Sequence, residues 1–257
     1  MDSRVVAQVT ANFRRYLMGW SEAERKDELL DYFCSGLAVP QFNGVVRVRS
    51  LGQIDHAVAT ARTRLAGVPW WWWVGPDSPM NTSTLLGDRG AEILAVLPVM
   101  ARPLGFDDLA PLEGAPIGLG IETVEESAML REVTRTYSAS MGLLPGLEAD
   151  LARIEVQRVD NADIVRLAAI LAGEVVGTAT VITAEEVAGI FLVHVAAPYR
   201  QRGIGRALTA TALRVGYERG MRLAALGASA AGEPLYRQFG FEKIFEYHIF
   251  NLSTMSA

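Results

Sequence analysis

The sequence predicts an α+β fold with a mixed sheet, in a chain divided into two parts. Strand and helix patterns alternate along the chain, two helices precede a group of consecutive strands in the second part, and one helix lies between later strands. Residues 102–116 break the pattern with three prolines, two glycines and acidic side chains. We therefore expect one domain at 1–113 and a second at 114–257.

Two capping-box patterns indicate helix starts in the first part: Ser21 with Glu24, and Ser50 with Gln53. The first of these helices should end near Gly36, because glycine commonly ends helices. In chain order, the expected elements are a helix at 3–18, a helix at 21–36, a strand at 43–50, a helix between 50 and 67, a strand at 70–74, a short helix at 83–88 and a strand at 91–100.

The strand at 70–74 contains four adjacent tryptophans, Trp70 to Trp73, out of five in the chain. They could form an aromatic surface that holds a ligand, or a buried strand whose alternate rings face its two sides. The buried strand is the favoured interpretation, because large rings bury much apolar area. A ring lining an acceptor pocket between the domains stays the alternative.

Strand patterns dominate the second part. The expected elements are a strand at 117–124, a helix at 125–142, a short helix at 146–153, strands at 164–171, 174–183 and 187–197, a helix at 203–219, a strand at 222–228, a short helix at 233–239 and strands within 241–252.

Composition excludes several classes of function. Half of the 257 residues are hydrophobic and 21% are charged, which is typical of a globular protein. The net charge of -5 argues against nucleic acid or an anionic membrane as main partner. No apolar run approaches the ~18 residues that span a bilayer. Cys34 is the single cysteine, so a cytoplasmic protein without internal disulfides is expected. The three histidines are scattered, and no metal site is predicted.

The stretch from Val195 to Leu208 carries the clearest chemistry. A strand ends there, a proline-bearing turn follows, and Gly203 and Gly205 open a helix. Glycines let the backbone approach an anion closely, and N–H groups at a helix start favour phosphate. Three arginines add positive charge around this loop: Arg200, Arg202 and Arg206. The residues therefore predict a phosphate or pyrophosphate cradle.

This stretch resembles the acetyl-CoA-binding motif of the GNAT acyltransferase superfamily, in which a strand valine precedes Arg/Gln-x-x-Gly-x-Gly/Ala at a helix start. The matching residues are Val195, Arg200, Gly203 and Gly205. About thirty residues on, Tyr236, Gly240 and Phe241 resemble the family's later motif, a helix with a tyrosine followed by Gly-Phe. From about Ile117 onward, the order of elements also looks like one copy of that fold, a mixed, mostly antiparallel sheet flanked by helices.

The resemblance implies an N-acetyltransferase that moves an acetyl group from acetyl-CoA to a small-molecule or peptide amine. The coenzyme's pyrophosphate would lie on the loop N–H groups, and its pantetheine arm would pair with the strand like an added strand. Ser229 stands where many members have an asparagine. The implied coenzyme-binding residues are Val193, Val195, Arg200, Gln201, Arg202, Gly203, Ile204, Gly205, Arg206 and Ser229.

Tyr236 would donate a proton to the departing thiolate, and a strand N–H near Val195 would polarise the thioester carbonyl. The general base is open. Strand alternation places Gly189, Phe191 and Val193 on the face of Val195, where none accepts a proton, and turns His194 to the other face as a packing residue. The remaining alternatives are Glu122, Glu125, Glu126 and a water relay.

The first part resembles a truncated, degenerate copy of the second. Residues 70–96 align with 222–247, so that Gly75 matches Gly227, Gly90 matches Gly240 and Leu86 falls at the place of Tyr236. No Gly-x-Gly loop precedes its first helix. A non-catalytic acyl-CoA sensor or accessory protein, and a scaffold that kept only the fold, are the alternative functions. A homodimer remains an open alternative for the oligomeric state.

Overall fold

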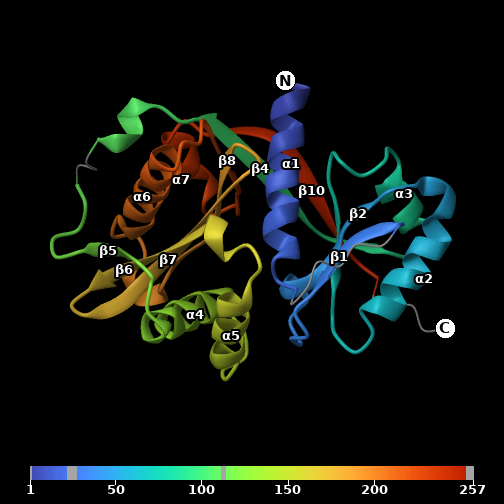
Figure 1. Ribbon diagram of the computed structural model, residues 1–257, viewed down its shortest axis with the longest axis horizontal. Coiled ribbons are helices and arrows are strands. Elements are labelled where there is room, and N and C mark those ends of the chain that lie inside the picture. Colours follow the sequence, from blue (N-terminus) through green and yellow to red (C-terminus); the bar gives the residue numbers. More distant parts are fainter. Residues whose placement is uncertain (1, 22–27, 111–113, 253–257) are drawn as a thin grey trace. The chain divides into compact units, whose positions relative to one another are not determined.

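The computed structural model describes residues 2–21, 28–110 and 114–252 and contains two compact units (Figure 1). The first unit comprises Met1–Met100 and Lys243–Ala257, and the second comprises Ala101–Glu242. The division predicted at 113/114 separates the sequence motifs, whereas spatial contacts group the last strand with the first unit. The division into residues 1–113 and 114–257 therefore stays a prediction about which part of the chain carries which function.

The first unit carries strands in the order β1-β2-β3-β10-β4. The β1/β2 and β3/β10 pairs are antiparallel, and β2/β3 is parallel. Its elements are α1 (Ser3–Met18), β1 (Leu30–Cys34), η1 (Pro40–Phe42), β2 (Asn43–Val48), η2 (Leu51–Gln53), α2 (Ile54–Arg64), β3 (Trp71–Val74), α3 (Thr82–Gly87), β4 (Glu92–Pro103) and β10 (Glu242–Asn251).

The helix predicted over 21–36 is wrong over its described second half. Leu30–Cys34 forms strand β1, in which Leu30 lies opposite Val48 of β2 and is fully buried. Glu24 of the capping pattern lies outside the described residues. Pairing with β2 overrides a local helical pattern here, because a short apolar run suits either element.

The second capping pattern is also wrong, although its helix is present. Ser50 makes no side-chain capping hydrogen bond, and a 3₁₀ turn separates it from α2, whose first residue is Ile54. By contrast, α1 begins and ends where its periodicity predicts. The Asp2 carboxylate accepts a hydrogen bond from the Arg4 backbone N–H at 2.9 Å, which caps the helix start.

The tryptophan strand has alternate rings on its two sides, as predicted. Trp70 and Trp72 have ring centroids 6.4 Å apart and belong to the apolar core built with α2. Trp71 and Trp73 pair on the other side, with centroids 6.1 Å apart. There Trp73 meets Tyr247 of β10 edge to face at 6.0 Å. The rings therefore serve as core on both sides of β3.

The second unit carries strands in the order β9-β8-β7-β6-β5. Its described pairs are antiparallel except β8/β9, which is parallel. Figure 1 shows α6 on one face of this sheet and α4 with α5 on the other. The elements are η3 (Phe106–Leu109), β5 (Gly120–Thr123), α4 (Ser127–Met141), α5 (Glu148–Gln157), η4 (Asn161–Asp163), β6 (Ile164–Leu171), β7 (Glu174–Ala184), β8 (Val187–Val195), η5 (Ala197–Tyr199), α6 (Ile204–Glu218), β9 (Leu223–Gly227) and α7 (Glu233–Gln238).

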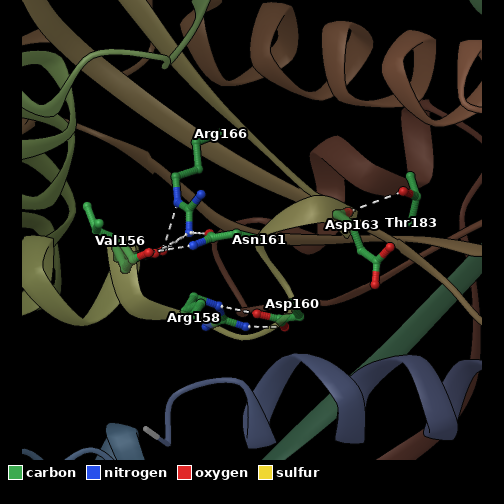
Figure 2. Close-up of polar contacts among 8 residues, drawn as sticks. Val156, Arg158, Asp160, Asn161, Asp163, Arg166 and Thr183 are labelled. Carbon is green, nitrogen blue, oxygen red and sulfur yellow. Dashed lines mark hydrogen bonds and ion pairs between the residues drawn. The ribbon is translucent and has the colours of Figure 1, made fainter.

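The turn from α5 into β6 is held by two ion pairs (Figure 2). Arg158 and Asp160 are joined by two hydrogen bonds of 2.9 and 2.8 Å, and both side chains are almost fully buried. Arg166 of β6 donates to Glu155 of α5 at 2.6 Å and to Asn161 at 2.8 Å. This cross-linking fixes α5 against the sheet.

Each half of the sequence supplies a strand to the other half's sheet. β10, which follows β9 and α7 in the chain, pairs with β3 in the first unit. In the second unit, the backbone N–H of Leu104, directly after β4, donates to the Arg222 carbonyl before β9 at 2.9 Å. The mixed, mostly antiparallel architecture predicted for the chain is confirmed, but this exchange of strands was not foreseen.

Candidate active site

β8 and β9 diverge in the second unit, and the candidate cleft lies at this divergence. The two strands pair from Val187 opposite Leu223 to Ile190 opposite Leu226, and no further. β8 then continues to Val195, whereas β9 ends at Gly227. The last residues of β8 therefore present backbone N–H and C=O groups without β9 as partner. An extended ligand arm can add to such an edge by main-chain hydrogen bonds.

A β-bulge in β8 decides which side chains face which side. Leu192 has φ +49°, and the register shifts so that Phe191 lies opposite Thr180 while His194 lies opposite Thr178. The Thr178 hydroxyl donates to the Leu192 carbonyl at 2.8 Å and secures the bulge.

The predicted placement of Phe191 on the face of Val195 is therefore wrong, because a bulge adds one residue to the strand and reverses the faces beyond it. Residues directly opposite in an antiparallel pair share a face, and Thr178 and Thr180, two apart in β7, share one too. Their partners Phe191 and His194 therefore lie on the same face of the sheet. Val195, opposite Gly177, lies on the other face.

Helix α6 covers the face that carries Val195. A Cβ added at Gly177 would lie 3.0 Å from Leu208 and 3.1 Å from Ile204, both in α6. The helix therefore begins beside the end of β8, on one defined face of the sheet. Phe191 and His194 lie on the opposite face, toward α4.

The loop before α6 has the geometry of an anion cradle. Gln201 has φ +60° and Gly203 has φ +83°, and Gly203 is the N-cap of α6. The first bond of the helix runs from the Ala207 N–H to the Gly203 carbonyl at 3.0 Å. Within the described chain, the N–H groups of Ile204, Gly205 and Arg206 make no hydrogen bond. These donors and the helix dipole favour a phosphate.

The three arginines of the loop differ in their contacts. Arg200 donates from Nε to the Val195 carbonyl at 3.0 Å and from Nη2 to the Ser140 hydroxyl at 3.2 Å. Arg202 lies over the Tyr199 ring, 5.5 Å from its centroid. Arg206 is exposed and makes no hydrogen bond or ion pair with another described residue. Arg200 therefore holds the end of β8 as well as adding charge.

His194 is held as a neutral side chain. Its Nδ1 lies 3.1 Å from the Ser140 hydroxyl. Burial, and then the positive charge of Arg200, lower the pKa of His194 to about 4. A group with that pKa carries almost no proton at pH 7. His194 lies on the face opposite to Val195, as predicted.

Tyr236 lies in α7 with a buried ring. It is 7% exposed and meets Phe241 edge to face, with centroids 6.0 Å apart. Burial raises the pKa of the Tyr236 hydroxyl to about 12, so it stays protonated at neutral pH. A Cβ added at Gly232 would lie 2.9 Å from the Tyr236 ring. The tyrosine is therefore fixed by its neighbours on two sides.

Ser229 begins the turn into α7. Its hydroxyl accepts from the Gly232 N–H at 3.2 Å, and its carbonyl accepts from the N–H groups of Gly232 and Glu233, both at 2.9 Å. These contacts give Ser229 a structural task next to the cleft. A role toward the coenzyme stays a prediction.

The carboxylates considered as alternative bases lie far from the cleft. Glu122 belongs to β5, and Glu125 and Glu126 lie in the connection from β5 to α4. β5 is the edge strand of the second unit, with β6 and β7 between it and β8. At ~4.8 Å per strand, β5 and β8 are about 14 Å apart.

Two features near the site were missed from the sequence. Ser140, which links His194 to Arg200, carries no pattern that marks it. The segment before β5 reaches the cradle, because a Cβ at Gly203 would lie 3.7 Å from Pro116. Neither is readable from spacing, because both depend on segments far apart in the chain.

Comparisons with known proteins identify this region. Residues 164–243, from β6 to the start of β10, match the family described as acetyltransferase (GNAT) domain. A solved structure of a GCN5-related N-acetyltransferase from Kribbella flavida has a TM-score of 0.70 at 19% identity, covering 96% of this chain and 95% of that one. A tandem GNAT protein from the clavulanic acid biosynthesis pathway has a TM-score of 0.56 at 16% identity, covering 83% and 76%.

A cobyric acid synthase of Ruegeria sp. (strain TM1040) is 29% identical over 129 residues. The match covers 49% of this chain but only 25% of the length of that relative. In the part of the chain that the structure describes, no helix is long and apolar enough to cross a membrane. The likeness of the solved structures concerns the fold, and the family match covers the cradle and α7. Residues 164–243 are thus similar to the GNAT acetyltransferase domain family, in the part of the chain that holds both sequence motifs, and the chain shares its fold with the solved N-acetyltransferase structure.

Proposed function

We propose that the protein is an acyl-CoA-dependent N-acyltransferase that uses acetyl-CoA and an amine acceptor. The observation that carries this proposal is the positive-φ loop ending in Gly203, which stands beside the edge of β8 that lacks a partner. The pyrophosphate would bind the N–H groups from Gln201 to Arg206, with charge from Arg202 and Arg206. The pantetheine arm would bind the backbone of Val193 and Val195.

Acetyl-CoA would supply an acyl group activated as a thioester. The amine nitrogen forms a bond to the acyl carbon, and the carbon–sulfur bond breaks. A backbone N–H near Val195 stabilises negative charge on the carbonyl oxygen. Tyr236 donates its hydroxyl proton to the departing sulfur, since its raised pKa keeps that proton in place until it is needed. The proton lost from the amine passes to solvent.

The first half is proposed to carry neither coenzyme nor acid. The turn before α2 contains Gly52, which has no positive φ, and no capping side chain. Leu86 is fully buried at the position that Tyr236 occupies in the second half. We propose 1–113 as the non-catalytic part and 114–257 as the part that carries the reaction.

Calorimetric titration with CoA and acetyl-CoA, followed by thiol release over a panel of amines, tests the function. Saturable binding with acceptor-dependent thiol release is expected. Binding without release across the panel would favour a non-catalytic acyl-CoA sensor, which is the second candidate because Ser229 is already engaged in the turn before α7. Absence of binding to either ligand would overturn both.

A further inference from the structure

The face of β8 that carries Phe191 and His194 is the approach left to the acceptor. α6 and its cradle cover the opposite face, as the contacts of Gly177 with Leu208 and Ile204 show. A coenzyme on the cradle therefore reaches the cleft from that face. The nucleophile must come from the other side of the sheet, where Phe191 is half-buried. This step rests on the proposed function.

The hydrogen bonds on that face hold a positive charge in place. The Arg200 guanidinium donates to the Val195 carbonyl and to the Ser140 hydroxyl, so it is fixed by two contacts. Because the Ser140 oxygen accepts from Arg200, its own proton is free to point at His194 Nδ1, 3.1 Å away. His194 then serves as acceptor at Nδ1 and is uncharged.

His194 indicates that this face disfavours a second positive charge beside Arg200. Burial and Arg200 both disfavour the charged imidazole, with burial the larger cause. The carboxylate nearest along β7, Glu174, accepts instead from the Tyr199 hydroxyl at 3.0 Å. A protonated amine placed beside Phe191 would meet the same two penalties as a protonated His194.

We propose that the acceptor is a weakly basic amine, such as an α-amino group, that binds and reacts in its uncharged form. A lysine-like alkylammonium ion is the disfavoured class. At pH 7 an α-amine with pKa ~7.8 is roughly 10% neutral, against about 0.04% for an alkylamine with pKa ~10.4. The difference in available nucleophile is on the order of several hundredfold. His194, Arg200 and Ser140 set this preference by position and do not transfer the proton.

The test uses the full chain with acetyl-CoA and acceptors of matched shape. The first set is a series of alkylamines whose pKa is lowered stepwise by fluorination next to the amino-bearing carbon. The second set compares an amino-acid amide, which offers an α-amine, with α-blocked lysine, which offers only its side-chain amine. Measured by thiol release at pH 7, kcat/KM should favour the α-amine by about a hundredfold or more. The pH midpoint of kcat/KM should follow the pKa of each acceptor.

Two variants of one position sharpen the result. His194→Glu places a carboxylate on this face and should raise the relative kcat/KM of blocked lysine about tenfold or more, whereas His194→Gln, its neutral match, should not. Thermal unfolding verifies that both fold. A preference for blocked lysine at pH 7, or one common midpoint for all acceptors, overturns the inference alone. If no acceptor in the panel supports thiol release, the proposed function is overturned and this inference with it.

Discussion

The run β2–α2–β3–α3–β4 and the run β8–α6–β9–α7–β10 have the same order of elements. Both begin with a parallel strand pair, β2/β3 and β8/β9. Both short helices end alike: Ala91 N–H donates to the Leu86 carbonyl at 3.0 Å, and Phe241 N–H to that of Tyr236 at 3.1 Å. Backbone geometry is thus shared even where chemistry is not.

The two runs differ in what occupies the end of the strands. In the second, β8 continues past its partner through a bulge and a positive-φ loop. In the first, β2 ends at Val48, and aromatic side chains are packed near β3. A Cβ added at Gly75 would clash with the Tyr247 ring. The end of β8 thus leads into a loop with positive φ angles, whereas the end of β3 is filled by aromatic side chains.

The largest expected effect concerns the exchange of strands. Residues 114–257 alone would carry β10 without β3, and β9 without β4 and the Leu104 N–H that follows it. Unpaired strand edges expose backbone polar groups and promote aggregation. Expressed by itself, this half should give no cooperative unfolding transition by circular dichroism. The full chain is the control, and a sharply melting fragment would show that the halves fold independently.

Tyr236→Phe should lower kcat by roughly 10²–10⁴-fold if Tyr236 is the general acid. Stability should change little, because the lost hydroxyl makes no hydrogen bond to a described residue. The matched change in the first half, Leu86→Ala, should cost about 2–5 kcal/mol of unfolding free energy and leave any acid-dependent step alone. An unchanged kcat in Tyr236→Phe would remove the chemical distinction between the halves.

His194 should make stability depend on pH. Its folded pKa of about 4 lies below the ordinary value of 6.5, so the unfolded chain binds more protons between these two values. The free energy of unfolding should therefore fall as pH drops from about 6.5 to about 4, by roughly 3 kcal/mol from this group. Denaturation of His194→Gln should lack that component. If the unfolding free energy of both proteins changed with pH in the same way, the placement of His194 would be contradicted.

The smallest effect is expected from glycine substitutions before the two helices. Gly203→Ala forces a side chain into φ +83° and should cost about 1–3 kcal/mol and weaken CoA binding at least tenfold. Gly52, before α2, has no positive φ and its nearest neighbour at 3.8 Å, so Gly52→Ala should change neither quantity appreciably. If both substitutions changed the CoA affinity and the melting temperature equally, the contrast between the two loops would be lost.

Much of the second half follows from local sequence. The strand at 164–171 and the glycine that begins α6 lie where periodicity and loop composition place them. In the first half, α1 is equally well determined, since its apolar spacing admits one face only. These elements satisfy their own hydrogen bonds or pair with the next segment in the chain, which is the information that spacing contains.

Other features depended on contacts distant in sequence. β1 is a strand because β2 pairs with it, despite a helical pattern. The bulge at Leu192 reverses the faces of β8, and no residue type there announces a positive φ. The linkage of His194 to Ser140 joins residues 54 positions apart.

The sequence by itself predicted the loop before α6, the tyrosine of α7 and the similarity to the GNAT family, because these rest on glycines, charges and spacing within short stretches. The tertiary structure decided which side chains share a face of β8 and which strands complete each sheet. Register, bulges and strand exchange are set by the free energy of whole sheets, and no short stretch of the chain encodes that sum.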